Sequence, residues 1–396
     1  MSAFPNAKQL RRPGASAAAP LATTKPSLRA ASPAANTKPR IKAVAPREER
    51  VTLPLAIDSG AFSFYMKVAS RYSADGKRLR GFAHADHTYS EKKDFAEYLD
   101  AYCEFIRAYG DQFEYCVALD VIGSPEKSLA IYRDMTKQGL RVLPVYHFGE
   151  PIKYLKAYMD STDYIGLGGL VKTGTKSASS GFRERTWKYL CDAKGKPLRK
   201  VHAFGMTSFE PMIQHPYYSV DSTTSFTWSR YGCIMVPHIH AVSKEFDFAN
   251  VPRIYPLTPG RSKTRTHLDH MHPTGHNRAA IDRYVAELGV PLESLRSEYG
   301  ARDTANLYFM NRMMKAVSLK HSQRCGSEVT MLYYASGNFS TTLPEFNKSL
   351  SHLEKMGALE HLAYLGTYAQ LNPLARLFKD WRGMNITDLQ HRGKMV

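Results

Sequence analysis

The chain has 396 residues and a formal net charge of +18, with 54 Lys and Arg against 36 Asp and Glu. This length is enough to bury a sizeable core, and no apolar run approaches the roughly 20 residues that span a bilayer, so we expect a soluble protein without a membrane partner. The charge exceeds what solubility requires and favours a polyanionic partner, with nucleic acid as the leading candidate. The five cysteines are widely separated, which predicts free thiols in a reducing compartment.

Residues 1–50 have the composition of a disordered basic arm. They are rich in Ala, Pro, Ser and Thr and carry ten Lys or Arg against two Glu, a net charge of +8. Such a segment cannot offset the entropy cost of ordering its backbone. A basic arm can add phosphate contacts, and it can equally be a solubilising tail. A transit peptide has a similar composition, but this segment lacks an amphipathic apolar face.

From residue 53 onward, short apolar runs alternate with stretches of helical pattern. The predicted strands are 53–58, 115–121, 141–147, 164–170, 200–205 and 218–222. The predicted helices are 91–109, 125–138, 151–160, 181–193 and 208–214. Pro125 and Pro151 are helix-start signals. Strands and helices in regular alternation predict a parallel sheet with crossover helices.

Repetition of this unit favours an α/β fold of the (β/α)8 TIM-like barrel type over an open, doubly wound sheet. We predict a seventh strand at 233–237 and an eighth at 329–334. Helical sequence at about 277–320 is then an insertion into a barrel domain of residues 51–340. Residues 341–396, with helical sequence at 343–380, are predicted to form a helical C-terminal extension.

The predicted strands end in residues that can bind ligands or perform chemistry. Asp58 and Asp221 each end an apolar run. The corresponding residues of the other strands are Asp120, His147, Gly168, Gly169 and the segment 202–205. Ligands of parallel sheets bind at the carboxyl ends of the strands, so carboxylates there indicate an enzyme that acts on a sugar or glycosidic centre. For any single aspartate, capping of the following turn is the alternative.

Four motifs follow one another along the chain with a characteristic spacing. They are Asp58-Ser-Gly-Ala-Phe62, Gly166-Leu-Gly-Gly-Leu170, His202-Ala-Phe-Gly205 and Val220-Asp221-Ser222. Together they resemble the guanine transglycosylases of the queuosine and archaeosine family, over about residues 53–240. The Ser-Thr-Thr-Ser context after Asp221 is similar to the archaeal branch. The basic N-terminal segment and the lack of a recognisable C-terminal RNA-binding domain are more similar to the phage and bacterial branch that acts on DNA.

This resemblance implies that a guanine is exchanged for a 7-deazaguanine base through a covalent sugar–aspartate intermediate. Asp221 would be the nucleophile that attacks C1′, and Asp58 would be the general acid and base. Asp120 would accept hydrogen bonds from N1–H and the exocyclic amine of guanine. The further residues implied in base binding are Phe62, Gly168, Gly169, Leu170, Phe204 and Gly205. Stacking on the base is implied for the two phenylalanines, for which core packing is the alternative.

The family carries a structural zinc on a Cys-x-Cys-x-x-Cys run and a later His, and this chain has no such run. His238 and His240 stand at the matching place, followed by a stretch that contains His267, His270, His272 and His276. Alternate residues of an extended segment share a face, so His238 and His240 together with His270 predict a histidine-only structural zinc site. Surface or phosphate-contacting histidines are the alternative.

The leading prediction is an enzyme that replaces guanine in DNA, in the cytoplasm or, for a phage-encoded protein, in the host cytoplasm. The same chemistry on tRNA is the nearest alternative. A third is a non-catalytic paralogue that binds nucleic acid, which the presence of both Asp58 and Asp221 disfavours, because a silent subunit needs neither. The sequence is compatible with a homodimer.

Overall fold

The computed structural model describes residues 53–62, 90–91, 93–170, 176–206, 209–259, 266–327, 331–335 and 343–368. The chain divides into residues 1–48 and 49–396, and every described residue belongs to the second unit. The arm predicted at 1–50 lies outside the described residues. Within the described residues, no helix is long and apolar enough to cross a membrane.

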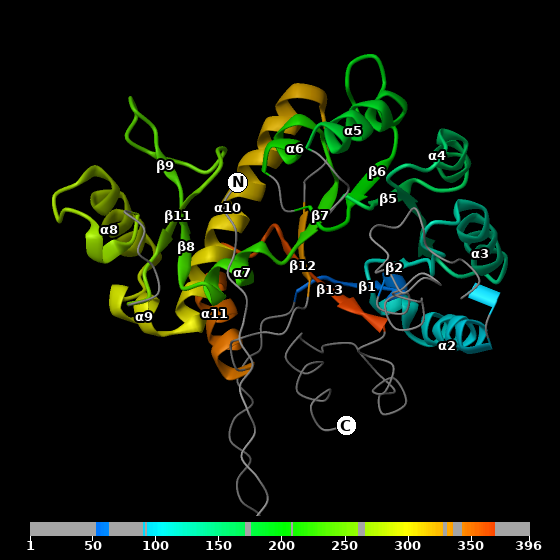
Figure 1. Ribbon diagram of the computed structural model, residues 1–396, viewed down its shortest axis with the longest axis horizontal. Helices are drawn as coiled ribbons and strands as arrows, with labels where there is room; N and C mark the ends of the chain where they lie inside the picture. The colour runs from blue at the N-terminus through cyan, green and yellow to red at the C-terminus, as the bar shows by residue number, and fades with distance from the viewer. Residues whose placement is uncertain are drawn as a thin grey trace, which may run out of the picture. The chain divides into compact units, whose positions relative to one another are not determined.

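The fold is a mixed α/β arrangement built on one parallel sheet (Figure 1). Its strands, in spatial order, are β3 (Val142–Leu143), β2 (Cys116–Val117), β1 (Leu55–Asp58), β13 (Leu362–Thr367), β12 (Met331–Ala335), β7 (Ser219–Ser222), β6 (Lys200–Ala203), β5 (Tyr164–Gly168) and β4 (Val145–His147). Every adjacent pair is parallel, so all strands end at the same edge. The strands predicted from 53 to 222 are all present in this sheet.

The first and last strands of this order, β3 and β4, are separated along the chain only by Pro144. Proline has no backbone N–H to donate to a ladder, and it interrupts the strand here. Its carbonyl still accepts a hydrogen bond of 2.8 Å from the Gly166 amide on β5. On the other side, Val142 of β3 is in register with Cys116 of β2. The segment 142–147 therefore pairs with both β2 and β5.

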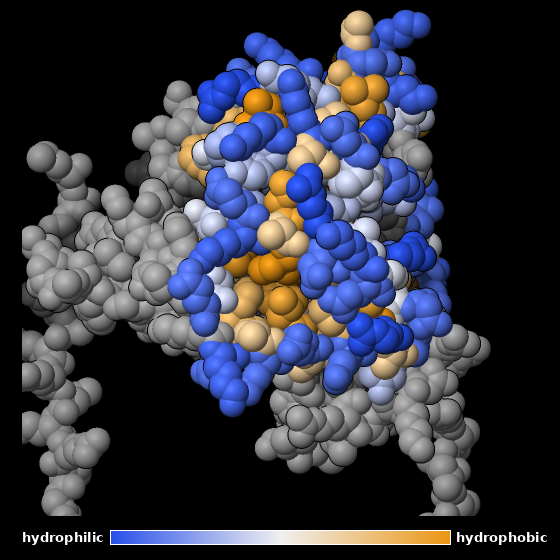
Figure 2. All heavy atoms as spheres, turned by 90° about the vertical axis from the view of Figure 1, so that its right-hand side faces the viewer, coloured by the Kyte–Doolittle hydropathy of each residue, from blue (hydrophilic) through white to orange (hydrophobic). Residues whose placement is uncertain are grey.

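Helices connect consecutive strands and lie outside the sheet (Figure 1). They are α2 (Lys93–Tyr109), α3 (Pro125–Lys137), α4 (Ile152–Met159), α5 (Lys176–Leu190), α6 (Phe209–Gln214) and α7 (Thr224–Arg230). Pro125 is the first residue of α3, where its missing amide leaves no intrahelical bond unmade. On α2, Phe95, Tyr102 and Ile106 recur at helical spacing and are buried. Figure 2, which views the side of α2 to α4, shows hydrophilic side chains around a central apolar patch.

Two apolar clusters occupy opposite faces of the strands. Successive side chains of a strand point to opposite faces, so Ala56 and Val117 join one cluster while Ile57 and Cys116 join the other. The members of the smaller cluster are Ala56, Tyr115, Val117, Leu143, Val145, Ala363 and Leu365. Phe204 packs against this cluster. The larger cluster fills the space between the strands and the helices.

The prediction that the strand at 233–237 belongs to the parallel sheet is wrong. This strand is β8 (Cys233–Val236), and it pairs antiparallel with β11 (Arg253–Pro256). The amide of Met235 donates to Asn306 Oδ1 at 2.7 Å, and Asn306 Nδ2 donates to the carbonyl of Cys233 at 3.2 Å. Asn306 lies on α10 (Tyr299–Cys325), which therefore fixes β8 beside it. The sequence of an apolar strand that is buried on both faces does not indicate which other strand it pairs with.

The remaining elements of this region follow β8 in the chain. They are β9 (His238–Ile239), β10 (Phe246–Asp247), α8 (His276–Leu288) and α9 (Leu292–Ser297). The strands β9 and β10 form a short antiparallel pair. Together with α10, the helices α8 and α9 confirm the helical sequence expected at 277–320.

The prediction that 343–380 is helical throughout is wrong. The helix α11 (Leu343–Lys355) is followed by β13, which lies between β1 and β12 in the parallel sheet. Leu362 and Ala363 are fully buried, and such a short apolar run carries no period that separates strand from helix. The strand predicted at 329–334 corresponds to β12 and belongs to the sheet.

Candidate active site

Three aspartates meet at the carboxyl-terminal edge of the sheet. Asp58 ends β1, Asp120 follows β2 by three residues, and Asp221 lies near the end of β7. Burial raises the pKa of Asp58 to about 7, and the negative charges of Asp120 and then Asp221 add to this rise. Asp120 and Asp221 are themselves buried. The charges of Asp120 and Asp221 both act on Asp58, so the three carboxyl groups are electrostatically coupled at the edge where the parallel strands end.

The turn after β1 shapes the surroundings of Asp58. The amide of Gly60 donates to Asp58 Oδ1 at 3.4 Å, and Gly60 has a φ of 78°, a conformation that favours glycine. The Tyr98 hydroxyl from α2 donates to the carbonyl of Ser59 at 2.6 Å and holds the turn in place. A carboxyl group with a pKa near 7 is half protonated at neutral pH. Asp58 is therefore suited to give and take a proton in this range.

Asp120 is held by an ionised histidine. His147 Nε2 lies 3.0 Å from Asp120 Oδ2, and the His147 amide donates to Glu150 Oε2 at 3.0 Å. Burial alone lowers the pKa of His147, but the charge of Asp120, its hydrogen bond and the contacts of Glu150 outweigh that effect and raise the pKa to about 10. His147 is therefore an imidazolium at neutral pH between two acidic side chains. Glu150 was not predicted from the sequence. Its His-x-x-Glu spacing from His147, directly before the proline that precedes α4, was the available signal.

The glycines of β5 make room for two rings at this edge. A Cβ atom on Gly168 would lie 2.5 Å from Cδ2 of His147, and one on Gly166 would lie 2.6 Å from Cε2 of Phe204. Gly169 has a φ of 70°. Leu170 is half-buried and packs against the larger cluster. Base binding by Gly168, Gly169 and Leu170 stays a prediction, and Gly168 has a second role in leaving room for the His147 ring.

Substituting Gly168 by alanine is expected to displace His147, because backbone-borne Cβ atoms do not occur 2.5 Å from another heavy atom. Displacing His147 moves Asp120 with it through their ion pair. An error of about 1 Å in a catalytic group costs on the order of 10²-fold in rate. We therefore expect Gly168→Ala to lower base exchange by about that factor, measured as incorporation of labelled base into nucleic acid.

Gly181→Ala is the matched control for this substitution. Gly181 lies on α5, and the nearest atom to its added Cβ would be Arg185 Nη1 at 3.3 Å, the free end of a long side chain. Alanine in a helix is about 1 kcal/mol more favourable than glycine. Exchange at the wild-type rate by both variants would contradict the seating of His147 by Gly168.

Asp221 is anchored through one of its oxygens. The Gly205 amide donates to Asp221 Oδ1 at 2.6 Å, and His202 Nε2 lies 3.5 Å from the same oxygen. Gly205 has a φ of 65° and lies two residues after the end of β6, the strand that pairs with β7. The assignment of Gly205 to the base stays a prediction, whereas its amide contact with Asp221 is a direct structural one.

Buried hydroxyl groups continue from His202 into the interior of the sheet. His202 Nδ1 lies 2.5 Å from Ser219 Oγ and 3.3 Å from the Tyr115 hydroxyl. The Tyr164 hydroxyl lies 2.5 Å from Ser219 Oγ. Tyr164, His202 and Ser219 lie on the neighbouring strands β5, β6 and β7, and Tyr115 directly precedes β2. Ser219 was not predicted from the sequence. Its position two residues before Asp221 on the same strand was a usable signal, because it puts both side chains on one face.

The two phenylalanines predicted to stack on the base have different surroundings. Phe62 is 53% exposed at the turn after β1. Phe204 is half-buried, packs against the smaller cluster, and meets His202 edge to face with ring centroids 4.3 Å apart. Phe204 thus has a packing role, and base stacking by both residues stays a prediction.

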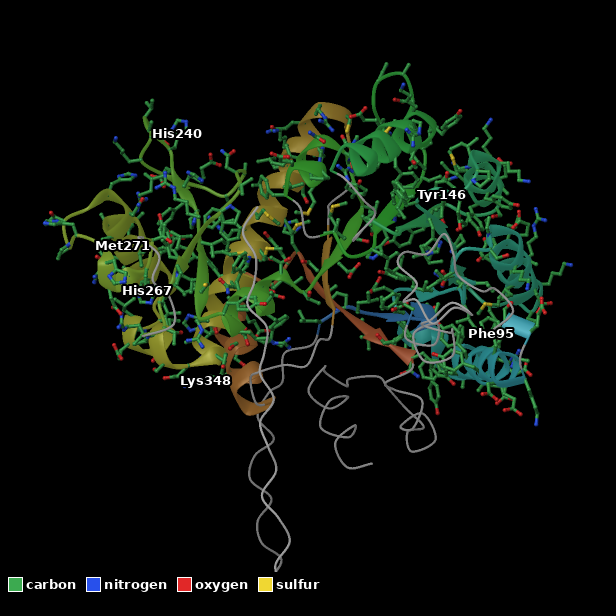
Figure 3. The ribbon with its side chains drawn as sticks, in the orientation of Figure 1. Phe95, Tyr146, His240, His267, Met271 and Lys348 are labelled. Carbon is green, nitrogen blue, oxygen red and sulfur yellow. The ribbon has the colours of Figure 1, made fainter. Side chains whose placement is uncertain are left out.

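The histidines proposed for zinc make contacts with the protein itself. His238 Nε2 lies 2.9 Å from the Val251 carbonyl, and His240 Nδ1 accepts from the Ser243 amide at 3.2 Å. His270 is exposed. In Figure 3, His240 lies at the far end of the β9 region, apart from His267. Among the described residues, no group of three or more His, Cys, Asp and Glu is placed to hold a metal, and a zinc site stays a prediction.

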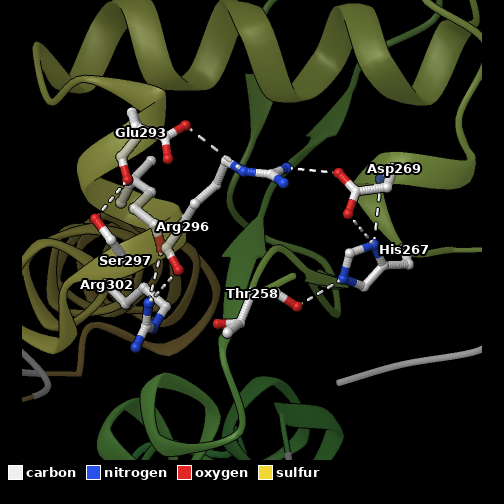
Figure 4. Close-up of polar contacts among 8 residues, drawn as sticks. Thr258, His267, Asp269, Glu293, Arg296, Ser297 and Arg302 are labelled. Carbon is white, nitrogen blue, oxygen red and sulfur yellow. Dashed lines mark hydrogen bonds and ion pairs between the residues drawn. The ribbon is translucent and has the colours of Figure 1, made fainter. Parts of the chain in front are cut away.

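His267 instead belongs to a polar network that joins the loop after β11 to α9 (Figure 4). His267 Nε2 lies 2.9 Å from the Thr258 carbonyl, and Nδ1 accepts from the Asp269 amide at 3.2 Å. Arg296 donates to Asp269 Oδ1 at 2.7 Å, and this hydrogen bond lowers the pKa of Asp269. The network stabilises the region between β11 and α10.

The candidate site is therefore defined by its own geometry. It contains the coupled carboxyl groups of Asp58, Asp120 and Asp221, an imidazolium at His147, and the glycines of β5 against which the His147 and Phe204 rings pack. No protein-family model, no curated protein and no solved structure matches this chain.

Proposed function

We propose that this protein is a guanine transglycosylase that replaces guanine in DNA with a 7-deazaguanine derivative. The observation that carries the proposal is the pair of carboxyl groups at one sheet edge, Asp58 with a pKa of about 7 and Asp221 anchored through Oδ1. One of them is suited to proton transfer, and the other is held as a nucleophile would be. A non-catalytic role gives no reason for this difference.

We further propose that the parallel sheet closes into a (β/α)8 barrel. Two observations support closure. The ends of the strand order, β3 and β4, are parts of one segment, and counting them as one strand gives eight. The smaller cluster, drawn from strands across this order, then fills the barrel interior, and the three aspartates lie at the face where such barrels carry their active sites.

The first half of the proposed reaction releases guanine. A carboxylate oxygen of Asp221 forms a bond to C1′ while the bond from C1′ to the base nitrogen breaks, and the bonding electron pair leaves with guanine. Protonated Asp58 donates its proton to a ring nitrogen of the departing base. The products are free guanine, a covalent sugar–aspartate ester and an Asp58 carboxylate.

The second half restores the enzyme. The Asp58 carboxylate removes a proton from the ring nitrogen of the incoming 7-deazaguanine, and that nitrogen attacks C1′ and displaces Asp221. Two inversions at C1′ return the original configuration of the sugar. Asp58 ends protonated and Asp221 ionised, as at the start.

Asp120 is proposed to select the base. Its carboxylate oxygens accept from N1–H and the exocyclic amine, a donor pair that guanine and 7-deazaguanines share. The His147 imidazolium, 3.0 Å from Asp120 Oδ2, fixes the orientation of that carboxylate. Hydrogen bonds to charged groups are about twice as strong as neutral ones, which suits a discriminating contact.

The net charge of +18 supports a polyanionic substrate. A base in a duplex must be flipped out before C1′ is reached, at a cost of a few kcal/mol, and phosphate contacts can offset that cost. The basic segment at 1–50 offers such contacts without regard to sequence. DNA is therefore the proposed substrate, and tRNA is the competing outcome of the test.

Nucleoside mass spectrometry after co-expression with a supply of deazaguanine tests this proposal. We expect a modified deoxyguanosine in DNA from cells with the wild-type protein, and none from cells with Asp221→Asn. Modification confined to tRNA would reassign the substrate but keep the chemistry. Unmodified DNA and tRNA, with the protein folded and the base supplied, would refute the proposed function.

A further inference from the structure

We propose that His202 is a positioning residue that fixes Asp221 so that Oδ2, and not Oδ1, attacks the sugar. This inference rests on the proposed function. His202 lies on β6, is fully buried, and is in register with Ser219 of β7. Asp221 follows Ser219 by two residues, so both side chains point to the same face of β7. His202 thus faces a hydroxyl group and a carboxylate at once.

The hydroxyl side of His202 allows two directions of hydrogen bonding. Nδ1 lies 2.5 Å from Ser219 Oγ and 3.3 Å from the Tyr115 hydroxyl, and the Tyr164 hydroxyl lies 2.5 Å from Ser219 Oγ. Hydroxyl groups both donate and accept. When Tyr164 donates to Ser219 and Ser219 donates to Nδ1, all three groups are satisfied, and the reverse order satisfies them equally. The first order makes Nδ1 an acceptor and puts the hydrogen on Nε2, so the choice between the two orders depends on what Nε2 faces.

The carboxylate side requires the hydrogen on Nε2. This nitrogen lies 3.5 Å from Asp221 Oδ1, and an ionised carboxylate only accepts hydrogen bonds. The Gly205 amide donates to the same oxygen at 2.6 Å. Oδ1 therefore accepts one hydrogen bond, from Gly205, and faces the Nε2 edge of His202 at 3.5 Å, just beyond ordinary hydrogen-bond length. Within the described part of the chain no hydrogen bond is made to Oδ2, which leaves that oxygen to face the substrate.

The ring of His202 is held against rotation. Phe204 meets it edge to face at a centroid distance of 4.3 Å and an interplanar angle of 71°. Phe204 in turn occupies the space that Gly166 leaves on β5. When the incoming base displaces Asp221, negative charge returns to the carboxylate, where the Gly205 amide already donates to Oδ1 and the Nε2 edge of His202 faces the same oxygen. His202 therefore acts through Asp221, without touching the sugar.

Three variants of the full-length protein separate positioning from packing. His202→Phe keeps a planar ring and removes both nitrogens. His202→Gln keeps an N–H donor at about the reach of Nε2. Ser219→Ala leaves the ring but removes the hydroxyl that is hydrogen-bonded to Nδ1. Each is assayed for the rate of covalent adduct formation with a guanine-containing DNA oligonucleotide, resolved on denaturing gels, and for oligonucleotide affinity.

We expect His202→Phe to slow adduct formation by about 10- to 100-fold, the range for losing a group that orients a reactive ligand, with unchanged affinity for the oligonucleotide. His202→Gln is expected to recover most of that rate, which a purely packing role would not produce. Ser219→Ala is expected to fall between wild type and His202→Phe. It keeps the test available if His202→Phe does not fold.

A second measurement does not depend on activity. In protein labelled with ¹⁵N-histidine, the His202 signal, assigned by its loss in His202→Gln, should report hydrogen on Nε2, and Asp221→Asn should shift it. Hydrogen on Nδ1 would overturn the inference, as would adduct formation by His202→Phe at the wild-type rate. A wild-type protein that forms no adduct refutes the proposed function, and the ¹⁵N result then decides the positioning of Asp221 by itself.

Discussion

Asp221→Asn is expected to abolish base exchange and the covalent adduct while leaving the fold intact. The amide is close in size to the carboxylate and can still accept from the Gly205 amide, so the local structure has no reason to change. An amide oxygen lacks the negative charge needed to attack C1′. Removing a nucleophile of this kind costs at least on the order of 10⁴-fold in rate.

The measurement is the appearance of a DNA–protein adduct, together with incorporation of a labelled 7-deazaguanine. Asp282→Asn is the matched control, because Asp282 lies on α8, pairs with Arg278 at 2.8 Å and is far along the chain from the sheet edge. Near-normal exchange by Asp221→Asn would remove the covalent mechanism proposed above.

Asp58→Asn is expected to lower exchange by about 10²- to 10⁴-fold, the range for general acid–base groups. Base binding should persist, because Asp120 and His147 are unchanged. In the wild-type protein the first half-reaction requires protonated Asp58, so its rate should fall as the pH rises through about 7. The residual rate of Asp58→Asn should not fall in this way as the pH rises. A decrease with the same midpoint in the variant would show that a group other than Asp58 causes it.

Asp58 also predicts a pH dependence of stability. Its pKa is about 7 in the folded protein and about 3.9 in an unfolded chain, so the folded state binds the proton more tightly. The free energy of unfolding therefore falls as the pH rises from about 4 to about 7, and the penalty is fully present above that range. Asp58→Asn removes it. We expect the melting temperature of the variant to exceed that of the wild type at pH 8, and the difference to be smaller at pH 4. A difference that does not depend on pH would contradict the raised pKa of Asp58.

The alternation of strands and helices was readable as far as residue 222 because each unit carries its own local signals. Pro125 starts a helix, and short apolar runs end in Asp58, Asp120 and Asp221. Strands that share a direction bring their ends to one edge, so the meeting of these carboxylates follows from order alone. The sheet membership of β8 and β13 did not follow, because pairing partners for runs buried on both faces depend on tertiary contacts such as those of Asn306.

Site residues could be predicted where a chemically reactive side chain stands at the end of a predicted strand. Glu150, Ser219 and Tyr115 were missed because each acts on a neighbour in space, on His147 or His202, and no short motif connects them in the sequence. Gly168 was expected to admit a base, and in the structure its neighbour is the His147 ring. Side-chain packing of this kind is decided by distances of a few tenths of an ångström, which a residue pattern does not encode.

The place of β13 has a consequence for how the chain folds during synthesis. All four residues of β1 pair with β13, with Asp58 opposite Thr367. At 5–20 residues per second, the ribosome needs roughly 15 to 60 seconds to add the residues between these two positions. Throughout that interval one edge of β1 has no partner strand, and such an edge is open to pairing with other chains. The strand that bears Asp58 therefore gains its second neighbour only when most of the chain has been synthesised.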